Sequence, residues 1–161
     1  MKIFNFILIL IFTMGTYSVA VSQDFQKSNF GDNMQKVKLI EGKPLSEFIR
    51  ENDSSICIVY ADKFGGVNSD VLFTFMDNKF IRGAYDLTNS KSLNNNSFTQ
   101  FIVIENLLIT KYGKPTISID YRSNDNFNKE VQLASEWQIN RIKISHTLFT
   151  SNFHIVDYDY K

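Results

Sequence analysis

The sequence predicts an α+β domain in which an antiparallel sheet of about six to seven strands carries helices packed on one face. The expected order of elements is α-βββ-α-βββ(β). Three observations lead to this prediction. Residues 97–115 read as a helix with both ends marked, alternating apolar and polar residues precede and follow that helix, and the 161 residues are enough for one domain.

Residues 1–20 predict a secretory signal peptide that is cleaved after export. A lysine precedes an apolar run, and the segment ends in the small residues Ser18, Val19 and Ala20. The alternative is an uncleaved anchor, but the apolar run is shorter than the ~20 residues that span a bilayer. No cysteine lies near the cleavage position, so we expect an exported protein, periplasmic or extracellular, that is neither a lipoprotein nor inserted in a membrane.

The rest of the chain is expected to form a flexible leader at residues 21–29 and a single domain at residues 30–161. Lysine and arginine number 17, as do aspartate and glutamate, so the net charge is zero. Without a basic cluster, nucleic acid and anionic membrane surfaces are not expected partners. Cys57 is the only cysteine, so no disulfide can form within the chain. Its apolar neighbours predict a buried core residue and not a reactive thiol.

The first predicted helix begins after Asp32, whose carboxylate suits an N-cap, with Gln35 three residues later as in a capping box. Apolar residues then recur at helical spacing until Gly42 and Pro44 end the helix. Because proline is favoured in the first turn of a helix, residues 45–51 are predicted to form a further short helical turn.

Three strands are predicted next, at residues 55–61, 70–76 and 79–87. The first is apolar on both faces and should lie in the centre of its sheet, whereas the other two alternate. Asp77 and Asn78 predict a tight hairpin turn between the last two. The three strands should therefore form an antiparallel meander.

The helix at residues 97–115 has the clearest boundaries. Ser97 is a good N-cap, and Gly113 followed by Pro115 marks the C-terminal end. Between them, apolar residues recur every three or four positions, a stripe broad enough to be largely buried against the sheet. They are Phe98, Phe101, Ile102, Ile104, Leu107, Leu108, Ile109 and Tyr112.

Strands are also predicted at residues 116–122, 140–149 and 153–160, with a turn at Asn152 before the last one. Residues 129–137 fit either a helix or a strand, and we prefer a strand. In coarse outline, a helix followed by a meander therefore occurs twice.

The pattern of a capped helix ending at Gly42, an aromatic-rich meander, a helix ending in Lys-Tyr-Gly-Lys-Pro at residues 111–115 and a terminal hairpin resembles a group of small exported bacterial α+β proteins of unknown function. The resemblance covers residues 30–160. In outline the chain is also similar to the helix-plus-sheet modules of secreted protein inhibitors, a likeness of fold that carries no function by itself.

His146 and His154 are the only histidines, and the predicted hairpin brings them near each other. As a metal site or an acid–base pair they need a third ligand or a carboxylate, for which Asp157 or Asp120 is available. Their spacing matches no metal motif, which favours two partly exposed sheet residues with neither metal nor cofactor.

The last predicted strand supplies further candidates for binding. Tyr158 and Tyr160 alternate with aspartates and are the aromatic pair that we expect to be exposed. Aromatic side chains on an uncovered sheet face are typical of a binding surface. The predicted binding residues are Tyr158, Tyr160, Asp157, His146 and His154.

The sequence contains no G-x-S-x-G, P-loop or C-x-x-C motif, and no catalytic residue is predicted. The expected function is therefore non-catalytic binding of a protein or a small ligand on the open face of the sheet. Two alternatives are a cell-envelope hydrolase that uses acidic residues and a histidine, and a structural envelope component that assembles with itself.

Overall fold

A computed structural model of the chain describes residues 24–88, 97–120 and 131–161, so the predicted signal peptide lies outside the described residues. The helices are α1 (Met34–Glu41) and α2 (Ser97–Tyr112). The strands are β1 (Ser46–Ile49), β2 (Ile56–Phe64), β3 (Val67–Met76), β4 (Lys79–Asp86), β5 (Ile117–Asp120), β6 (Val131–Ile139), β7 (Ile142–Phe149) and β8 (His154–Tyr160). In this described part of the chain, neither helix has the length and apolar character of a membrane span.

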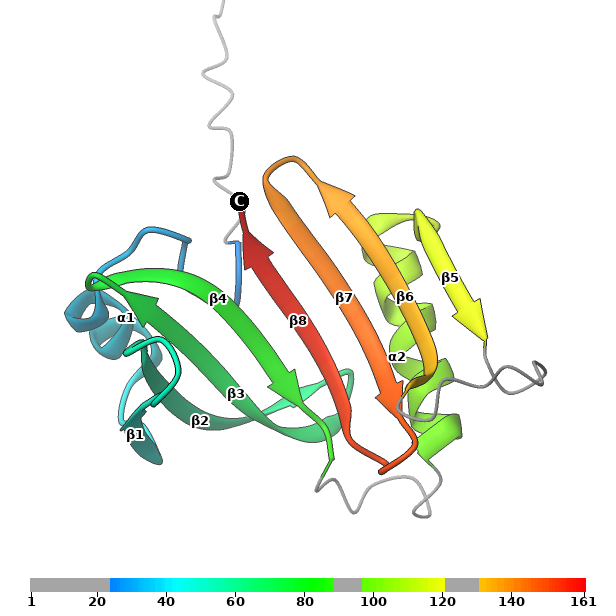
Figure 1. The fold of residues 1–161 in the computed structure, drawn as a ribbon, viewed down its shortest axis with the longest axis horizontal. Coiled ribbons are helices and arrows are strands. Elements are labelled where there is room, and N and C mark those ends of the chain that lie inside the picture. Colours follow the sequence, from blue (N-terminus) through cyan, green and yellow to red (C-terminus); the bar gives the residue numbers. More distant parts are fainter. Residues whose placement is uncertain (1–23, 89–96, 121–130) are drawn as a thin grey trace, which may run out of the picture.

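All these strands join one antiparallel sheet in the order β1-β2-β3-β4-β8-β7-β6-β5. Each half of the chain is a helix followed by a four-strand meander, and the last strands of the two halves, β4 and β8, pair at the centre of the sheet (Figure 1). The predicted antiparallel sheet with two helices is confirmed. Within the described residues the sheet has eight strands, however, where six to seven were expected, and the order of elements is α-ββββ-α-ββββ.

The additional strand is β1, which lies where residues 45–51 were predicted to form a helical turn. Its residues pair with β2, from Ser46 opposite Val59 to Ile49 opposite Ile56. A short helix gains few hydrogen bonds for the dihedral angles it fixes, whereas a strand of the same length pairs with a neighbour that is already in place. The tertiary context therefore overrides the local signal. The preferred strand at residues 129–137 corresponds to β6.

Helix α1 begins one residue later than predicted, because its N-cap is Asn33. The side-chain oxygen of Asn33, not that of Asp32, accepts the N–H of Lys36 and caps the helix. Asp32 instead forms an ion pair with the Lys36 ammonium at 2.6 Å. Gly42 ends the helix with a φ of 95°, as its position predicts.

Helix α2 ends as predicted, because Gly113 has a φ of 81° and takes the left-handed conformation that closes a helix. Ile104 and Leu108 project into the core and are buried. The buried stripe is narrower than predicted, since Ile102 and Leu107 stay 42% and 41% exposed.

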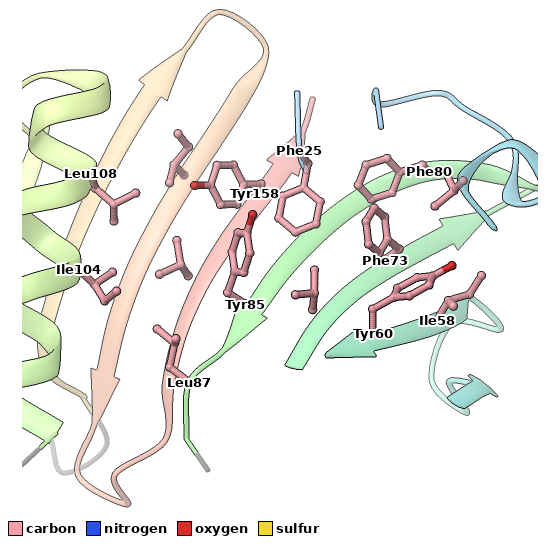
Figure 2. Close-up of a cluster of buried hydrophobic side chains, with 14 of the residues drawn as sticks. Phe25, Ile58, Tyr60, Phe73, Phe80, Tyr85, Leu87, Ile104, Leu108 and Tyr158 are labelled. Carbon is pink, nitrogen blue, oxygen red and sulfur yellow. The ribbon is translucent and has the colours of Figure 1, made fainter. Parts of the chain in front are cut away.

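Residues 24–29 belonged to the predicted flexible leader, but Phe25 lies in the core and is only 2% exposed (Figure 2). Its ring contacts four aromatic rings at centroid distances between 4.9 and 5.9 Å. These rings belong to Phe73, Phe80, Tyr85 and Tyr158. The prediction of a loose leader is wrong for this part, because burial of one large aromatic side chain is enough to fix a short segment.

Both helices lie on one face of the sheet. Val37 of α1 and Ile104 and Leu108 of α2 belong to a single buried cluster that includes Phe25. The opposite face, here called the open face, carries neither helix (Figure 1).

Candidate functional site

The structure brings the two histidines together under α2. Their Nε2 atoms are 2.8 Å apart, and the residues are 0% and 1% exposed. The ring of Phe101, from α2, stacks on His146 with 3.9 Å between the ring centroids. The prediction that His146 and His154 are partly exposed is therefore wrong, because both point to the face that α2 covers.

Two further residues extend this pair, and sequence analysis missed both. Glu105 accepts a hydrogen bond from His146 Nδ1 at 2.8 Å and another from the Ser135 hydroxyl at 2.7 Å. Ser135, Glu105, His146 and His154 thus form a continuous hydrogen-bonded chain, here called the histidine cluster. Glu105 lies three residues before Leu108 on the buried stripe of α2, where a carboxylate requires a polar partner. The position of Glu105 on this stripe was the feature of the sequence that could have predicted a buried polar site.

The hydrogen bonds define where the protons lie. The carboxylate of Glu105 only accepts, so His146 Nδ1–H donates to it. In the neutral form of His146, Nε2 then accepts from His154 Nε2–H. Burial lowers the pKa of His146 despite the nearby carboxylate. Burial, and next to it repulsion from His146 whenever that ring is protonated, lowers the pKa of His154 to about 3. Both imidazoles are therefore neutral at pH 7. The Nδ1 of His154 is buried and has no hydrogen-bond partner within the described structure.

The geometry of the histidine pair is that of a hydrogen bond. Two imidazole nitrogens on a tetrahedral zinc, with bonds of about 2.0–2.1 Å, lie roughly 3.3 Å apart, which is longer than the 2.8 Å between His146 and His154. Across residues 24–88, 97–120 and 131–161, no group of three or more histidine, cysteine, aspartate or glutamate side chains suits a metal ion.

The other predicted binding residues lie apart from the histidines. Tyr158 was expected to be exposed but is 2% exposed, because the alternation along β8 places it on the same face as His154. Tyr160 lies at the end of β8, is 41% exposed, and has the Arg141 guanidinium 5.6 Å from its ring centroid. Asp157 points to the open face, where it takes part in the site described next.

A hollow of about 430 Å³ crosses the open face from β1 to the turn between β7 and β8. Its volume falls in the range of small-ligand pockets. Most of the residues that line it are apolar or small: Phe48, Cys57, Leu72, Thr74, Ala84, Phe149, Phe153 and Ile155. The charged members of the lining are Arg50, Arg82, Asp86 and Asp157. Cys57 is 1% exposed, which confirms the predicted buried cysteine, and burial raises the pKa of its thiol.

Arg82 contributes a charged group to this hollow. Its Nε and Nη2 atoms contact the two carboxylate oxygens of Asp157 at 2.9 and 2.8 Å, and Nε also lies 3.3 Å from Asp159. The contact with Asp157 raises the pKa of Arg82. Burial raises the pKa of Asp157 more than the guanidinium lowers it, yet the two-pronged geometry is that of an ionised pair.

A second hollow, of about 510 Å³, adjoins the first, and the two share Asp86. Asp70 lies directly opposite Asp86 in the pairing of β3 with β4, and both line this hollow. Like charges in that position repel one another. The open face therefore combines an apolar floor with an acidic end.

The fold is similar to that of a protein of known structure, a DUF4309 family protein (YjgB) from Bacillus subtilis subsp. subtilis str. 168. The TM-score is 0.50, the sequences are 12% identical, and the similarity covers 86% of each chain. At this identity the likeness is one of fold alone. Neither a protein-family model nor a curated protein matches the sequence.

Proposed function

We propose that this chain is a non-catalytic binding domain that takes up a segment of a partner protein in the hollow of its open face. The observation that carries the proposal is the hollow of about 430 Å³ with an apolar floor, on the face that neither described helix covers. Phe48 lies at one end and Phe153 at the other, so an extended segment that crosses the strands meets aromatic rings at both ends.

The charges of the open face favour a partner segment that carries a basic residue. Arg82 is already paired with two carboxylates, so it adds little attraction for an anion. Arg50, the other cation of the lining, follows β1 at the opposite end of the β2–β3 pair from Asp70. Asp70 and Asp86 repel each other across neighbouring strands, and a lysine or arginine placed between them would relieve this repulsion. The partner is thus a protein segment with apolar side chains followed by a basic one.

A selection of random peptides displayed on phage tests this proposal directly. The expected result is enrichment of peptides that combine apolar residues with lysine or arginine. Synthetic copies should perturb the backbone NMR signals of Leu72, Ala84 and Ile155, which line the hollow. Absence of enrichment, or perturbation confined to α1 and α2, would contradict the proposal.

Matched substitutions sharpen the test. Leu72→Gln should weaken binding of a selected peptide about tenfold, because it removes apolar contact area. The same substitution at Leu39, which is 85% exposed on α1, should leave binding unchanged. Asp70→Asn should weaken binding and reduce its salt dependence, whereas Asp77→Asn, in the turn between β3 and β4, should do neither. Equal effects of test and control variants would count against the open face.

We further propose that the domain acts after export, with residues 1–20 removed. The support is the apolar run that follows a lysine and ends in small residues. Expression of the full chain in a bacterium, followed by mass spectrometry of the purified protein, tests this. A retained N-terminal methionine on protein from the cytoplasmic fraction would contradict it.

A further inference from the structure

The histidine cluster joins α2 to the sheet through buried polar contacts. Glu105 belongs to α2, whereas Ser135, His146 and His154 belong to the neighbouring strands β6, β7 and β8. The neutral form of the pair satisfies three of its four ring nitrogens, and the fourth, His154 Nδ1, is an acceptor without a partner in the described structure.

Addition of a proton disturbs this arrangement at either ring. On His154, the new Nδ1–H would be a buried donor without an acceptor. The protonated ring would also carry a buried positive charge that no carboxylate in the described part of the chain contacts directly. On His146, the new Nε2–H would point at the Nε2–H of His154 and force that ring into its other tautomer. The acid form of the pair is therefore much less compatible with the closed structure than the neutral form.

We propose that the His146–His154 pair is a pH-sensitive lock that holds α2 against the sheet at neutral pH and releases it in acid. Among the residues that the structure describes, the charged group that faces the pair is Glu105, from α2. Ser135, from β6, and Thr88, which follows β4 and accepts the backbone N–H of His154, are neutral. Burial lowers the pKa of both histidines, and the carboxylate of Glu105 does not reverse this for His146.

The helix, and not the strands, is the element that moves. His146 and His154 lie on paired strands, with backbone pairing from Ile142 opposite Tyr160 to Leu148 opposite His154. Helix α2 is attached to these strands by side chains, which include the Phe101 ring stacked on His146 and the carboxylate of Glu105. Once α2 leaves, both imidazoles reach water and recover their ordinary pKa.

Hydrogen exchange of the backbone amides measures the release of α2. Between about pH 7.5 and about pH 5, the opening equilibrium should rise by about 30-fold from His154 alone, because its pKa of about 3 in the closed state returns to near 6.5 on release. Proton uptake by His146 acts in the same direction. After correction for intrinsic exchange rates, the amides of α2 should exchange through this local opening and remain less protected than those of β3 and β4, which are exposed only by global unfolding. Unchanged protection of α2 in acid, or protection of α2 equal to that of β3 and β4, would overturn the lock.

Because the chain has only two histidines, their NMR signals report the pair without assignment by mutation. The expected result is that both rings stay neutral as the pH falls, until a second set of signals from the released state appears in acid. Titration of both rings near pH 6.5, with α2 still protected, would overturn the proposal. This measurement uses the unmodified protein and does not depend on the folding of any variant.

His154→Gln separates the titration from the structural role of the side chain. A glutamine amide places a donor near the position of the histidine Nε2, so it can still donate to His146, but it does not take up a proton. The variant should fold at neutral pH and lose about 30-fold of the pH dependence of α2 opening. A pH dependence identical to that of the unmodified protein would contradict the proposal.

Discussion

Replacement of Gly83 by alanine should displace Phe25 from the core. A Cβ atom at Gly83 would lie 2.6 Å from the nearest atoms of the Phe25 ring, one of which is Cγ, where the ring joins its stem. Ordinary carbon contacts are about 3.5–4.0 Å, so a methyl group does not fit. The backbone of Gly83 is outside the left-handed region, so alanine causes no backbone strain there. The steric conflict with Phe25 is thus the main effect of the substitution.

The expected loss of stability lies between two limits. If the sheet and the ring shift slightly, the cost is that of overpacking, about 1–3 kcal/mol. If Phe25 leaves the core, the cost approaches that of removing a buried phenylalanine, about 3–5 kcal/mol. Because the ring is only 2% exposed and contacts four other aromatic rings, it has little room to shift. We expect Gly83→Ala to lower the free energy of unfolding by about 3 kcal/mol.

A double-mutant cycle measured by urea unfolding provides the assay, with Trp137, the single tryptophan, as the fluorescent probe. Once Phe25→Ala has removed the ring, a methyl group at Gly83 has space, and Gly83→Ala should then cost under about 1 kcal/mol. The coupling between the two substitutions should therefore exceed about 2 kcal/mol. Additive effects would refute the packing of Phe25 on β4, and with it the ordered position of residues 24–29.

Three further predictions follow from the two sites. The free energy of unfolding should fall as the pH drops below about 6.5, by about 2 kcal/mol at pH 5 for His154, because the unfolded chain takes up a proton that the folded state, with a pKa of about 3, refuses. A free energy constant over this range in urea titrations would contradict the neutral state of His154. Arg82→Met should destabilise the protein by roughly 1–3 kcal/mol, since it leaves the carboxylate of Asp157 without its partner, and Arg82→Met combined with Asp157→Leu should recover much of that loss in the same assay. Cys57 should react with a thiol reagent only in denaturant, since burial raises its pKa and excludes the reagent. Fast labelling of the native protein would contradict this, because it would show that the Cys57 thiol is accessible to solvent from the hollow.

The features that sequence predicted well depend on local interactions. The C-terminal end of α2 needs only Gly113, and the turn between β3 and β4 needs only Asp77 and Asn78, which both have a positive φ, 51° and 59°. The buried position of Cys57 follows from the apolar residues on either side of it. Each of these depends on side chains within a few positions of one another, so no knowledge of the tertiary structure is required.

The features that sequence missed depend on contacts between distant segments. Strand β1 exists because β2 offers it a partner, and Phe25 is ordered because β4 has a glycine at position 83. The inward orientation of Tyr158 could have been predicted, since Asp157 and Asp159 alternate with it and carboxylates prefer the open face. Glu105 could have been recognised by its place on the buried stripe of α2. Its partners, however, lie 30 and 41 positions later in the chain.

Strand β8 links the two sites, because alternate residues serve opposite faces. His154 belongs to the lock on the helix side, and Asp157 belongs to the hollow on the open side. In acid, the proposed release of α2 leaves β8 paired with β4 and β7, so the floor of the hollow keeps its shape. A peptide selected on the open face should therefore bind His154→Gln and the unmodified protein equally at about pH 5. Any change in the charge of Asp70 and Asp86 at this pH should affect both proteins alike. Loss of binding in the unmodified protein alone would instead mean that α2 and the open face form one cooperative unit.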